Sequence, residues 1–185
     1  TMHFPAGEEQ KRRIIQMGEQ PSNVFVFGKP GLDSLHRLKL FNRKELEHQL
    51  HLKFNERIFL ITFHPVTLEN KTSSKQCESL LEALSNFQDT TIIFTKPNSD
   101  EGGRIIIELI QNFVENDPKN YFIFSNLGQR KYLSCVNLAT VLIGNSSSGM
   151  IEAPVFKTPT INIGNRQHGR ISADSVINCT PNPNH

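Results

Sequence analysis

The sequence predicts an α/β protein built on a doubly wound parallel sheet. Short runs rich in Val, Ile and Phe alternate with longer runs whose apolar residues recur at helical spacing. Strands that are covered by helices on both faces have this continuous apolar character. The chain has 185 residues, of which 37% are hydrophobic and 21% are charged, as in ordinary globular proteins. This length is sufficient for one such domain with a core of its own.

The predicted strands are short, and the helices between them have recognisable ends. The strands are predicted at residues 23–27, 57–63, 91–95, 121–124, 140–143, 160–163 and 176–178. The helices are predicted at residues 8–17, 43–51, 73–87, 104–114 and 150–155. Gly18 is placed to end the first helix as a left-handed cap, and Asn42 with Glu45 is placed to form a capping box before the second. This alternation predicts right-handed crossovers between parallel strands.

Two segments of unequal size are predicted. Residues 1–40 have the pattern of the last βα step of a preceding domain, followed by a linker. Residues 41–185 form the main domain, and we expect it to be truncated at its end, because residues 180–185 contain two prolines and no apolar residue.

Composition and charge disfavour several classes of partner. The formal net charge is +2 and no dense basic stripe is present, which disfavours nucleic acid. No apolar run approaches the roughly 20 residues of a membrane helix, and no export signal is visible. Cys77, Cys135 and Cys179 are scattered and form no metal-binding pair. We therefore predict a cytoplasmic protein with no membrane partner and no metal.

Polar side chains follow five of the predicted strands, where an open parallel sheet binds its ligands. Polar loops are the default in any soluble protein, but here the strand interiors carry almost no polar residues, which favours a ligand site. In chain order these residues are His64, Asn98, Asp100, Ser125, Asn126, Asn145, Ser146, Ser147, Ser148, Asn165, Arg166, His168 and Arg170.

The most informative segment is G-N-S-S-S-G at residues 144–149, between a predicted strand and a predicted helix. Backbone N–H groups, the helix dipole and serine hydroxyls favour an anion there, and glycines allow a phosphate to approach. Glu152, in the helix, is placed to accept hydrogen bonds from a ribose diol. The alternatives are a serine that only caps the helix and a glutamate that only offsets its dipole. The segment also resembles a nucleophile elbow, G-x-S-x-G, but the first glycine is missing, which disfavours a hydrolase.

His64 precedes Pro65 at the end of a predicted strand. A histidine in that position can donate to a phosphate or take part in proton transfer. The alternative is a loop histidine with no role.

Four segments together resemble the hydrolysing UDP-N-acetylglucosamine 2-epimerases of bacterial sialic-acid synthesis. They are T-F-H-P-V-T at 62–67, K-P-N-S-D at 96–100, G-N-S-S-S-G at 144–149 with Glu152, and I-G-N-R-Q-H-G-R at 163–170. The likeness extends over most of the chain. It implies a Rossmann-like domain, the carboxyl-terminal half of a glycosyltransferase-B type two-domain fold that holds a UDP-sugar between its halves.

The resemblance also implies a role for each matching residue. His64 is the expected catalytic residue, reaching the diphosphate and sugar. The loop 125–128, with Asn126, is expected at the uracil edge. The other expected UDP contacts are Asn98 in the nucleotide pocket, Ser146, Ser147 and Arg166 at the diphosphate, and Glu152 at the ribose. Asp100, Ser148 and Arg170 are further candidates for this site.

The implied reaction needs no cofactor or metal. UDP is eliminated across C1 and C2 to give a glycal, and water then adds to give N-acetylmannosamine. The acid–base residues of the family belong mostly to the amino-terminal domain, so we expect this chain alone to bind UDP without turnover. The full-length enzyme is expected to be a homo-oligomer. The P-V-T continuation after His64 is similar to the hydrolysing rather than the non-hydrolysing branch.

Three alternatives remain open. A sister epimerase acts on UDP-2,4-diacetamido-6-deoxy sugars in the route to legionaminic acid. The donor-binding domain of a glycosyltransferase has the same fold, but residues 164–170 and His64-Pro65 disfavour it. A non-catalytic nucleotide-sensing domain is the third.

Overall fold

The computed structural model describes residues 1–66, 72–97 and 102–184. The chain divides into two compact units, Thr1–Lys39 and Leu40–His185, which are described separately.

The first unit contains two α-helices and a short 3₁₀ helix: α1 (Glu8–Gln16), η1 (Pro21–Asn23) and α2 (Pro30–Arg37). The predicted end of α1 is confirmed, because Gly18 has φ of +102° and its N–H donates to the carbonyl of Ile15 at 2.9 Å. Helix α2 was not predicted. It begins at Pro30, whose fixed φ suits the first position of a helix.

The predicted strand at residues 23–27 is wrong. Among the described residues only Val24 of this run pairs, in an isolated parallel bridge with His3. A run of β-forming residues becomes a strand only when a neighbouring strand accepts its backbone hydrogen bonds. Phe4, Phe25 and Phe27 instead stack on one another, with ring centroids 5.9–6.3 Å apart.

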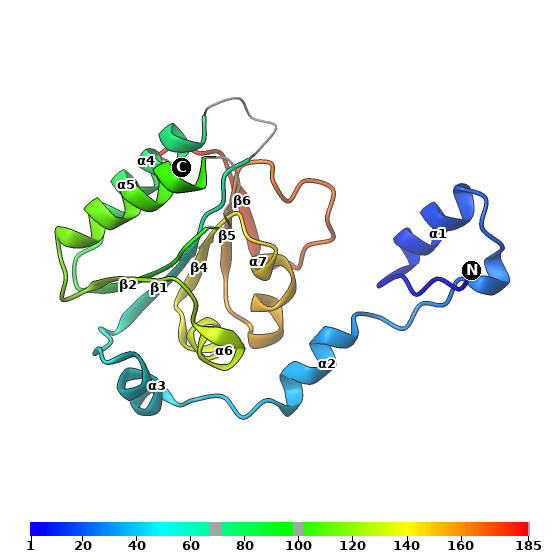
Figure 1. The fold of residues 1–185 in the computed structure, drawn as a ribbon, viewed down its shortest axis with the longest axis horizontal. Coiled ribbons are helices and arrows are strands. Elements are labelled where there is room, and N and C mark those ends of the chain that lie inside the picture. The colour runs from blue at the N-terminus through cyan, green and yellow to red at the C-terminus, as the bar shows by residue number, and fades with distance from the viewer. Residues whose placement is uncertain (67–71, 98–101, 185) are drawn as a thin grey trace. The chain divides into compact units, whose positions relative to one another are not determined.

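The second unit is built on a six-stranded sheet in which every pair is parallel. Its strands are β1 (Arg57–Thr62), β2 (Thr90–Thr95), β3 (Tyr121–Phe124), β4 (Val141–Gly144), β5 (Thr160–Ile163) and β6 (Val176–Cys179). The spatial order is β3-β2-β1-β4-β5-β6 (Figure 1). The predicted doubly wound parallel sheet is thus confirmed.

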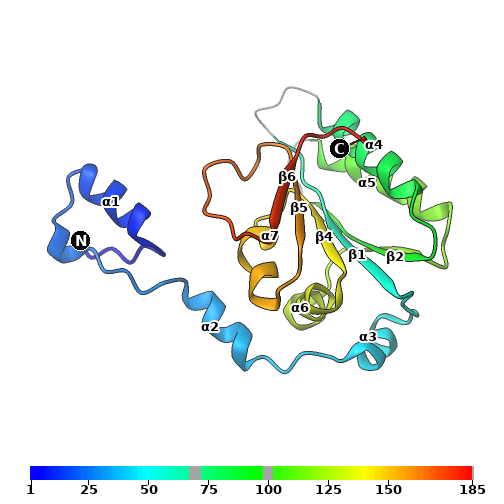
Figure 2. The same ribbon diagram turned by 180° about the vertical axis from the view of Figure 1, so that it is seen from behind.

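Helices cover both faces of this sheet (Figure 2). Helices α4 (Ser73–Ser85) and α5 (Gly103–Glu115) cover one face, and α3 (Arg43–Leu50), α6 (Gly128–Leu138), α7 (Ser148–Ile151) and η2 (Ala153–Phe156) cover the other. In β1, Phe59 and Ile61 join the first core cluster, whereas Ile58 and Leu60 join the second. This double covering explains why the strands are apolar throughout.

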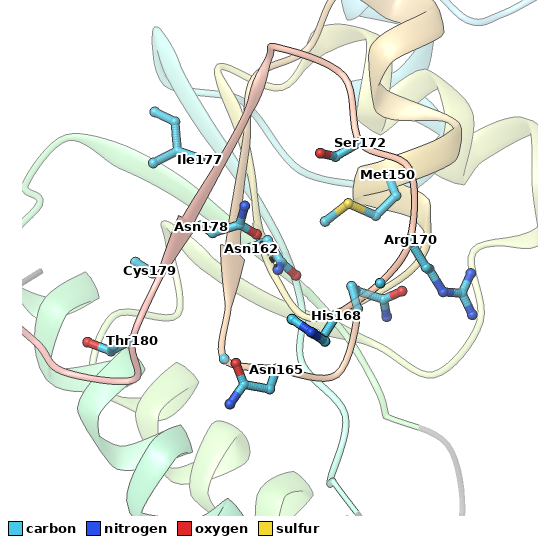
Figure 3. A pocket seen from close by; sticks show the side chains of 13 residues that line it. Met150, Asn162, Asn165, His168, Arg170, Ser172, Ile177, Asn178, Cys179 and Thr180 are labelled. Atoms are coloured by element: carbon cyan, nitrogen blue, oxygen red, sulfur yellow. Dashed lines mark hydrogen bonds between the residues drawn. The ribbon is translucent and has the colours of Figure 1, made fainter. Parts of the chain in front are cut away.

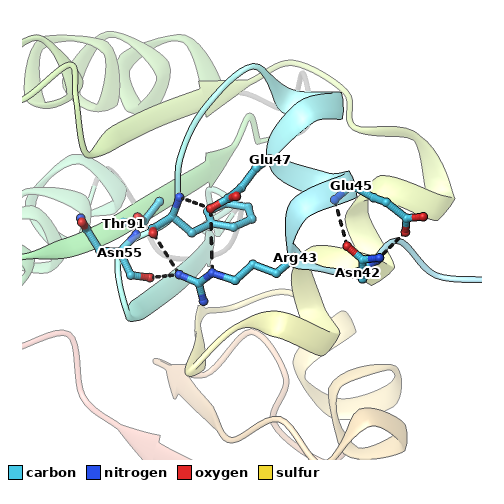
Figure 4. Close-up of polar contacts among 7 residues, drawn as sticks. Asn42, Arg43, Glu45, Glu47, Asn55 and Thr91 are labelled. Carbon is cyan, nitrogen blue, oxygen red and sulfur yellow. Dashed lines mark hydrogen bonds and ion pairs between the residues drawn. The ribbon is translucent and has the colours of Figure 1, made fainter.

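Helix α3 is fixed to the amino-terminal edge of the sheet (Figure 4). The predicted capping box is confirmed: the Glu45 N–H donates to Asn42 Oδ1 at 3.0 Å, and the Asn42 N–H donates to Glu45 Oε2 at 2.8 Å. Arg43 donates to the carbonyl of Phe54 at 2.9 Å, and the Asn55 N–H donates to Thr91 Oγ1 at 2.8 Å. These contacts lie before β1 and at the start of β2, so they leave the carboxyl edge of the sheet to other residues.

The predicted helix at 150–155 is wrong in its extent. Helix α7 contains only Ser148–Ile151, and the 3₁₀ helix η2 follows it. Pro154 is the reason, because proline has no N–H to donate to the carbonyl four residues earlier and its ring clashes with that carbonyl. Glu152 therefore lies at the break between the two helices rather than inside one longer helix.

No helix in the described part of the chain is long and apolar enough to cross a membrane.

Candidate functional site

The strand order reverses between β1 and β4, which are hydrogen-bonded neighbours. After β1 the chain continues to α4 on one face of the sheet, and after β4 it continues to α7 on the other. The two connections separate at their carboxyl ends, and this is where doubly wound sheets bind ligands. His64 follows β1 and Asn145 to Ser148 follow β4, so both groups of predicted residues flank this point.

The two glycines of the 144–149 segment are required by packing within the protein. A Cβ on Gly144, which has φ of +137°, would lie 2.1 Å from the carbonyl oxygen of Thr62. A Cβ on Gly149 would lie 2.5 Å from Thr160 Cγ2. The two glycines therefore let β4 and α7 approach β1 and β5 closely. That they also let a phosphate approach the backbone stays a prediction.

The serines between the glycines differ in their hydrogen bonds. Ser146 Oγ accepts from the Ser148 N–H at 3.3 Å, so one serine does act as a local cap. Within the described residues, the N–H groups of Ser146 and Ser147 and the Ser147 hydroxyl have no hydrogen-bond partner. Both serines are half-buried. Because α7 has a single turn, these three donors, and not a long helix dipole, are the groups that can bind an anion here.

Arg166 is brought to this loop from the connection after β5. Its Nη1 donates to the carbonyl of Asn145 at 3.1 Å, and Gln167 Nε2 donates to the same oxygen at 2.7 Å. His64, which is 8% exposed, is held from the other side because its N–H donates to Asn145 Oδ1 at 2.7 Å. Three predicted contributors, His64, the serine loop and Arg166, therefore meet around Asn145.

Tyr132 of α6 was not predicted as part of this region, because α6 itself was not predicted. Burial raises the pKa of its hydroxyl most, and the nearby carboxylate of Glu152 raises that pKa further. Glu152 is half-buried.

Arg170 is exposed. With Asn165 and His168 it lines a cavity of about 620 Å³ between β5, β6 and the connection after β5 (Figure 3). The lining of this cavity includes Met150 but none of His64, the first two serines, Glu152 or Arg166.

Asn126 belongs to the loop after another strand. It follows β3, which is three strands from β4, or about 14 Å across the sheet at about 4.8 Å per strand. Its Oδ1 accepts from the Gly128 N–H at 2.7 Å, so the side chain stabilises the start of α6. The remaining predicted residues, Asn98 and Asp100, lie outside the described residues.

Other catalytic chemistry finds little support in the described residues. In that part of the chain no group of three or more His, Cys, Asp or Glu side chains is placed to hold a metal ion. Burial raises the pKa of Cys77 and of Cys135 to about 12, so these two are inert thiols rather than nucleophiles.

The comparison with protein families identifies the chain. The model of the family described as UDP-N-acetylglucosamine 2-epimerase matches residues 1–185. The chain belongs to this 2-epimerase family. The resemblance predicted from the sequence is confirmed.

The 2-epimerase chain is similar to curated proteins of bacteria, among them the following two. It is 41% identical over 176 residues to the GDP/UDP-N,N'-diacetylbacillosamine 2-epimerase (hydrolyzing) of Campylobacter jejuni, covering 95% of this chain and 46% of that protein. It is 40% identical over 180 residues to the polysialic acid biosynthesis protein P7 of Escherichia coli, covering 95% of this chain and 44% of that protein. The chain thus spans about half the length of these relatives.

A solved structure shares the fold. The UDP-GlcNAc 2-epimerase of Neisseria meningitidis, bound to UDP-GlcNAc, matches with a TM-score of 0.67 at 16% identity, over 99% of this chain and 49% of that one. At this identity the likeness concerns the fold alone, and it agrees with the predicted Rossmann-like half of a two-domain enzyme.

Proposed function

We propose that the full-length protein is a hydrolysing 2-epimerase of a nucleotide-linked 2-acetamido sugar, and that this chain supplies its UDP site. One observation carries the proposal. In a chain that matches the 2-epimerase family throughout, three donors without partners among the described residues lie at the reversal of strand order, with Arg166 hydrogen-bonded to the same loop.

In this proposal the donors of the serine loop bind the leaving diphosphate. The N–H groups of Ser146 and Ser147, the Ser147 hydroxyl and the guanidinium of Arg166 face the charge that develops as the bond to C1 breaks. Donors held in place beforehand stabilise such charge more than mobile water does. His64, on the other side of Asn145, reaches the diphosphate and the sugar.

The rest of the nucleotide is proposed to extend along the carboxyl edge of the sheet. Glu152 accepts hydrogen bonds from the ribose hydroxyls, and the 125–128 loop with Asn126 faces the uracil. The distance between Asn126 and the serine loop suits an extended ligand rather than a compact one. Asn98 is proposed to line the nucleotide pocket, and Asp100, Ser148 and Arg170 are further proposed contacts.

Because the relatives are about twice as long as this chain, we assign nucleotide binding and acid–base chemistry to different halves of the full-length protein. We propose that residues 1–40 belong to the junction with an amino-terminal domain, that residues 41–185 form the UDP-binding domain, and that the other half supplies the acid–base groups. This chain alone then binds UDP and turns nothing over. Homo-oligomerisation is proposed for the full-length enzyme. The buried free thiols Cys77 and Cys135 support a reducing, cytosolic location.

The names of the relatives suggest two candidate sugars for the substrate. The 41% identical protein is named for N,N'-diacetylbacillosamine, with either GDP or UDP, and the 40% identical protein for polysialic acid biosynthesis. We propose a UDP-linked 2-acetamido sugar, with N,N'-diacetylbacillosamine and N-acetylglucosamine as the two forms to test.

The reaction predicts a specific pair of products. The C2 proton and UDP leave to form a C1–C2 double bond, then hydroxide adds at C1 and a proton at C2 from the opposite face. The full-length protein is incubated separately with UDP-diacetylbacillosamine, GDP-diacetylbacillosamine and UDP-N-acetylglucosamine. Proton NMR of the reaction mixture that contains its substrate should show the free nucleotide and the free 2-epimer of the sugar. A manno sugar that stays linked to UDP would place the protein among non-hydrolysing enzymes.

Replacing Glu152 with Gln is expected to raise the Kd for UDP about tenfold, while kcat changes little. Two charge-assisted hydrogen bonds are worth about 1.5–3 kcal/mol, and one decade is about 1.4 kcal/mol. Ribose contacts are the same in substrate and transition state, so their loss weakens binding rather than chemistry. Calorimetry with UDP measures the change, and Glu115→Gln, on an exposed residue at the end of α5, is the control. A fall in melting temperature with unchanged UDP affinity would show that Glu152 serves only the helix.

A further inference from the structure

The side chain of Asn145 is fully buried, at 0% exposure, and both of its polar atoms bond to the main chain of one residue. The His64 N–H donates to Asn145 Oδ1 at 2.7 Å, and Asn145 Nδ2 donates to the His64 carbonyl at 2.8 Å. The two residues are 81 positions apart in the sequence. This paired arrangement requires a donor and an acceptor on the same short side chain, which only asparagine provides at this length.

The main chain of Asn145 makes a further contact with the end of β1 and contacts one more segment, the connection after β5. Its N–H donates to the Thr62 carbonyl at 3.1 Å. Its carbonyl accepts from Arg166 Nη1 at 3.1 Å and from Gln167 Nε2 at 2.7 Å. One buried residue therefore connects the chain after β1, after β4 and after β5, at the point where the strand order reverses.

The backbone N–H and carbonyl of His64 together require an amide side chain at position 145. In a buried site both backbone groups of His64 need a partner, since a buried unpaired group costs about 1–3 kcal/mol. An aspartate at position 145 would keep the acceptor but place a negative oxygen against the His64 carbonyl. A serine would be too short to reach both groups.

We propose that Asn145 is the positioning residue of the nucleotide-sugar site, setting where His64 and Arg166 lie relative to each other. The role rests on the proposed function, because it assigns His64 and Arg166 to the diphosphate and sugar. Asn145 itself touches no substrate: its side chain holds the backbone of His64, and its carbonyl holds the guanidinium of Arg166. A displacement of about 1 Å in such a group reduces turnover on the order of a hundredfold.

The test compares Asn145→Asp and Asn145→Ser with a matched variant elsewhere in the full-length protein. Thr158→Val is the control, because Thr158 is also buried and its hydroxyl donates to the Val136 carbonyl at 2.7 Å, away from the serine loop. We expect both Asn145 variants to lower kcat/KM at least thirtyfold at a temperature well below their melting points. Thr158→Val should also lower the melting temperature, because it removes a buried hydrogen bond, but it should leave kcat/KM within threefold of the wild-type value.

A double-mutant cycle separates positioning from general stability. In a His64→Ala background the side chain that Asn145 positions is gone, so Asn145→Asp should lower kcat/KM less than fivefold further. An undiminished thirtyfold loss in that background would overturn positioning through His64. Asn145 variants as active as Thr158→Val would overturn the positioning role alone. A wild-type protein that releases no free nucleotide from any of the three sugars would overturn the proposed function and this role together.

Discussion

Replacing Gly144 with alanine should destabilise this chain by more than about 4 kcal/mol, or prevent a cooperative unfolding transition altogether. The new Cβ would lie 2.1 Å from the Thr62 carbonyl oxygen, and the backbone φ of +137° is unfavourable for any side chain. Thr62 is central in the sheet, paired with Thr95 on one side and with Gly144 itself on the other, so it has little freedom to move away. Urea unfolding followed by far-UV circular dichroism measures the loss.

The matched control for this prediction is Gly128→Ala. Gly128 also has a positive φ, of +65°, but a Cβ there meets nothing within 4 Å. Its replacement should cost only the conformational strain of about 1–2 kcal/mol. Equal losses for the two variants would mean that the contact with Thr62 relaxes and that Gly144 is needed for its dihedral angles alone.

Replacing Arg166 with methionine is expected to lower kcat/KM of the full-length enzyme by a factor on the order of 100–1,000. Removing one donor aimed at developing negative charge has an effect of this size in other enzymes. Methionine keeps much of the apolar stem but loses the charge and the hydrogen bond to the Asn145 carbonyl. Steady-state kinetics and calorimetry with UDP should both show the change, with the larger effect on turnover.

Lys119→Met is the control for the loss of a positive charge. Lys119 is exposed and lies just before β3, at the opposite edge of the sheet from the serine loop. It should leave kcat/KM unchanged. If Arg166→Met lowered kcat/KM less than threefold, the proposed contact with the leaving diphosphate would be wrong, whatever the reaction proves to be.

Local sequence patterns were sufficient for most elements of the second unit. Each of the six strands was predicted within one or two residues, because strands buried on both faces must be continuously apolar. The capping box at Asn42 and Glu45 was also predictable, since all of its hydrogen bonds lie within four consecutive residues. Where a partner outside the segment was needed, as for residues 23–27, the pattern alone gave the wrong result.

Helix α6 shows why part of the region around the site was missed. Its residues Gly128–Leu138 mix exposed, half-buried and buried positions and lack a strong apolar stripe, so neither the helix nor the placement of Tyr132 could be predicted. A packing role of the glycines was missed for a related reason. Only the approach of β4 to β1 shows that a side chain on Gly144 would meet the Thr62 carbonyl.

The sequence by itself determined the fold class, the family and the identity of the polar residues that follow each strand. These depend on burial and on motifs, both of which are written in consecutive residues. The tertiary structure decided the order of the strands, and hence that His64, the serine loop and Arg166 meet, whereas Asn126 follows a strand three positions away from β4 in the sheet. It also showed that Asn145 connects three of these segments. The physical reason is that strand pairing and buried hydrogen bonds join groups far apart in the chain, and such contacts leave no local pattern to detect.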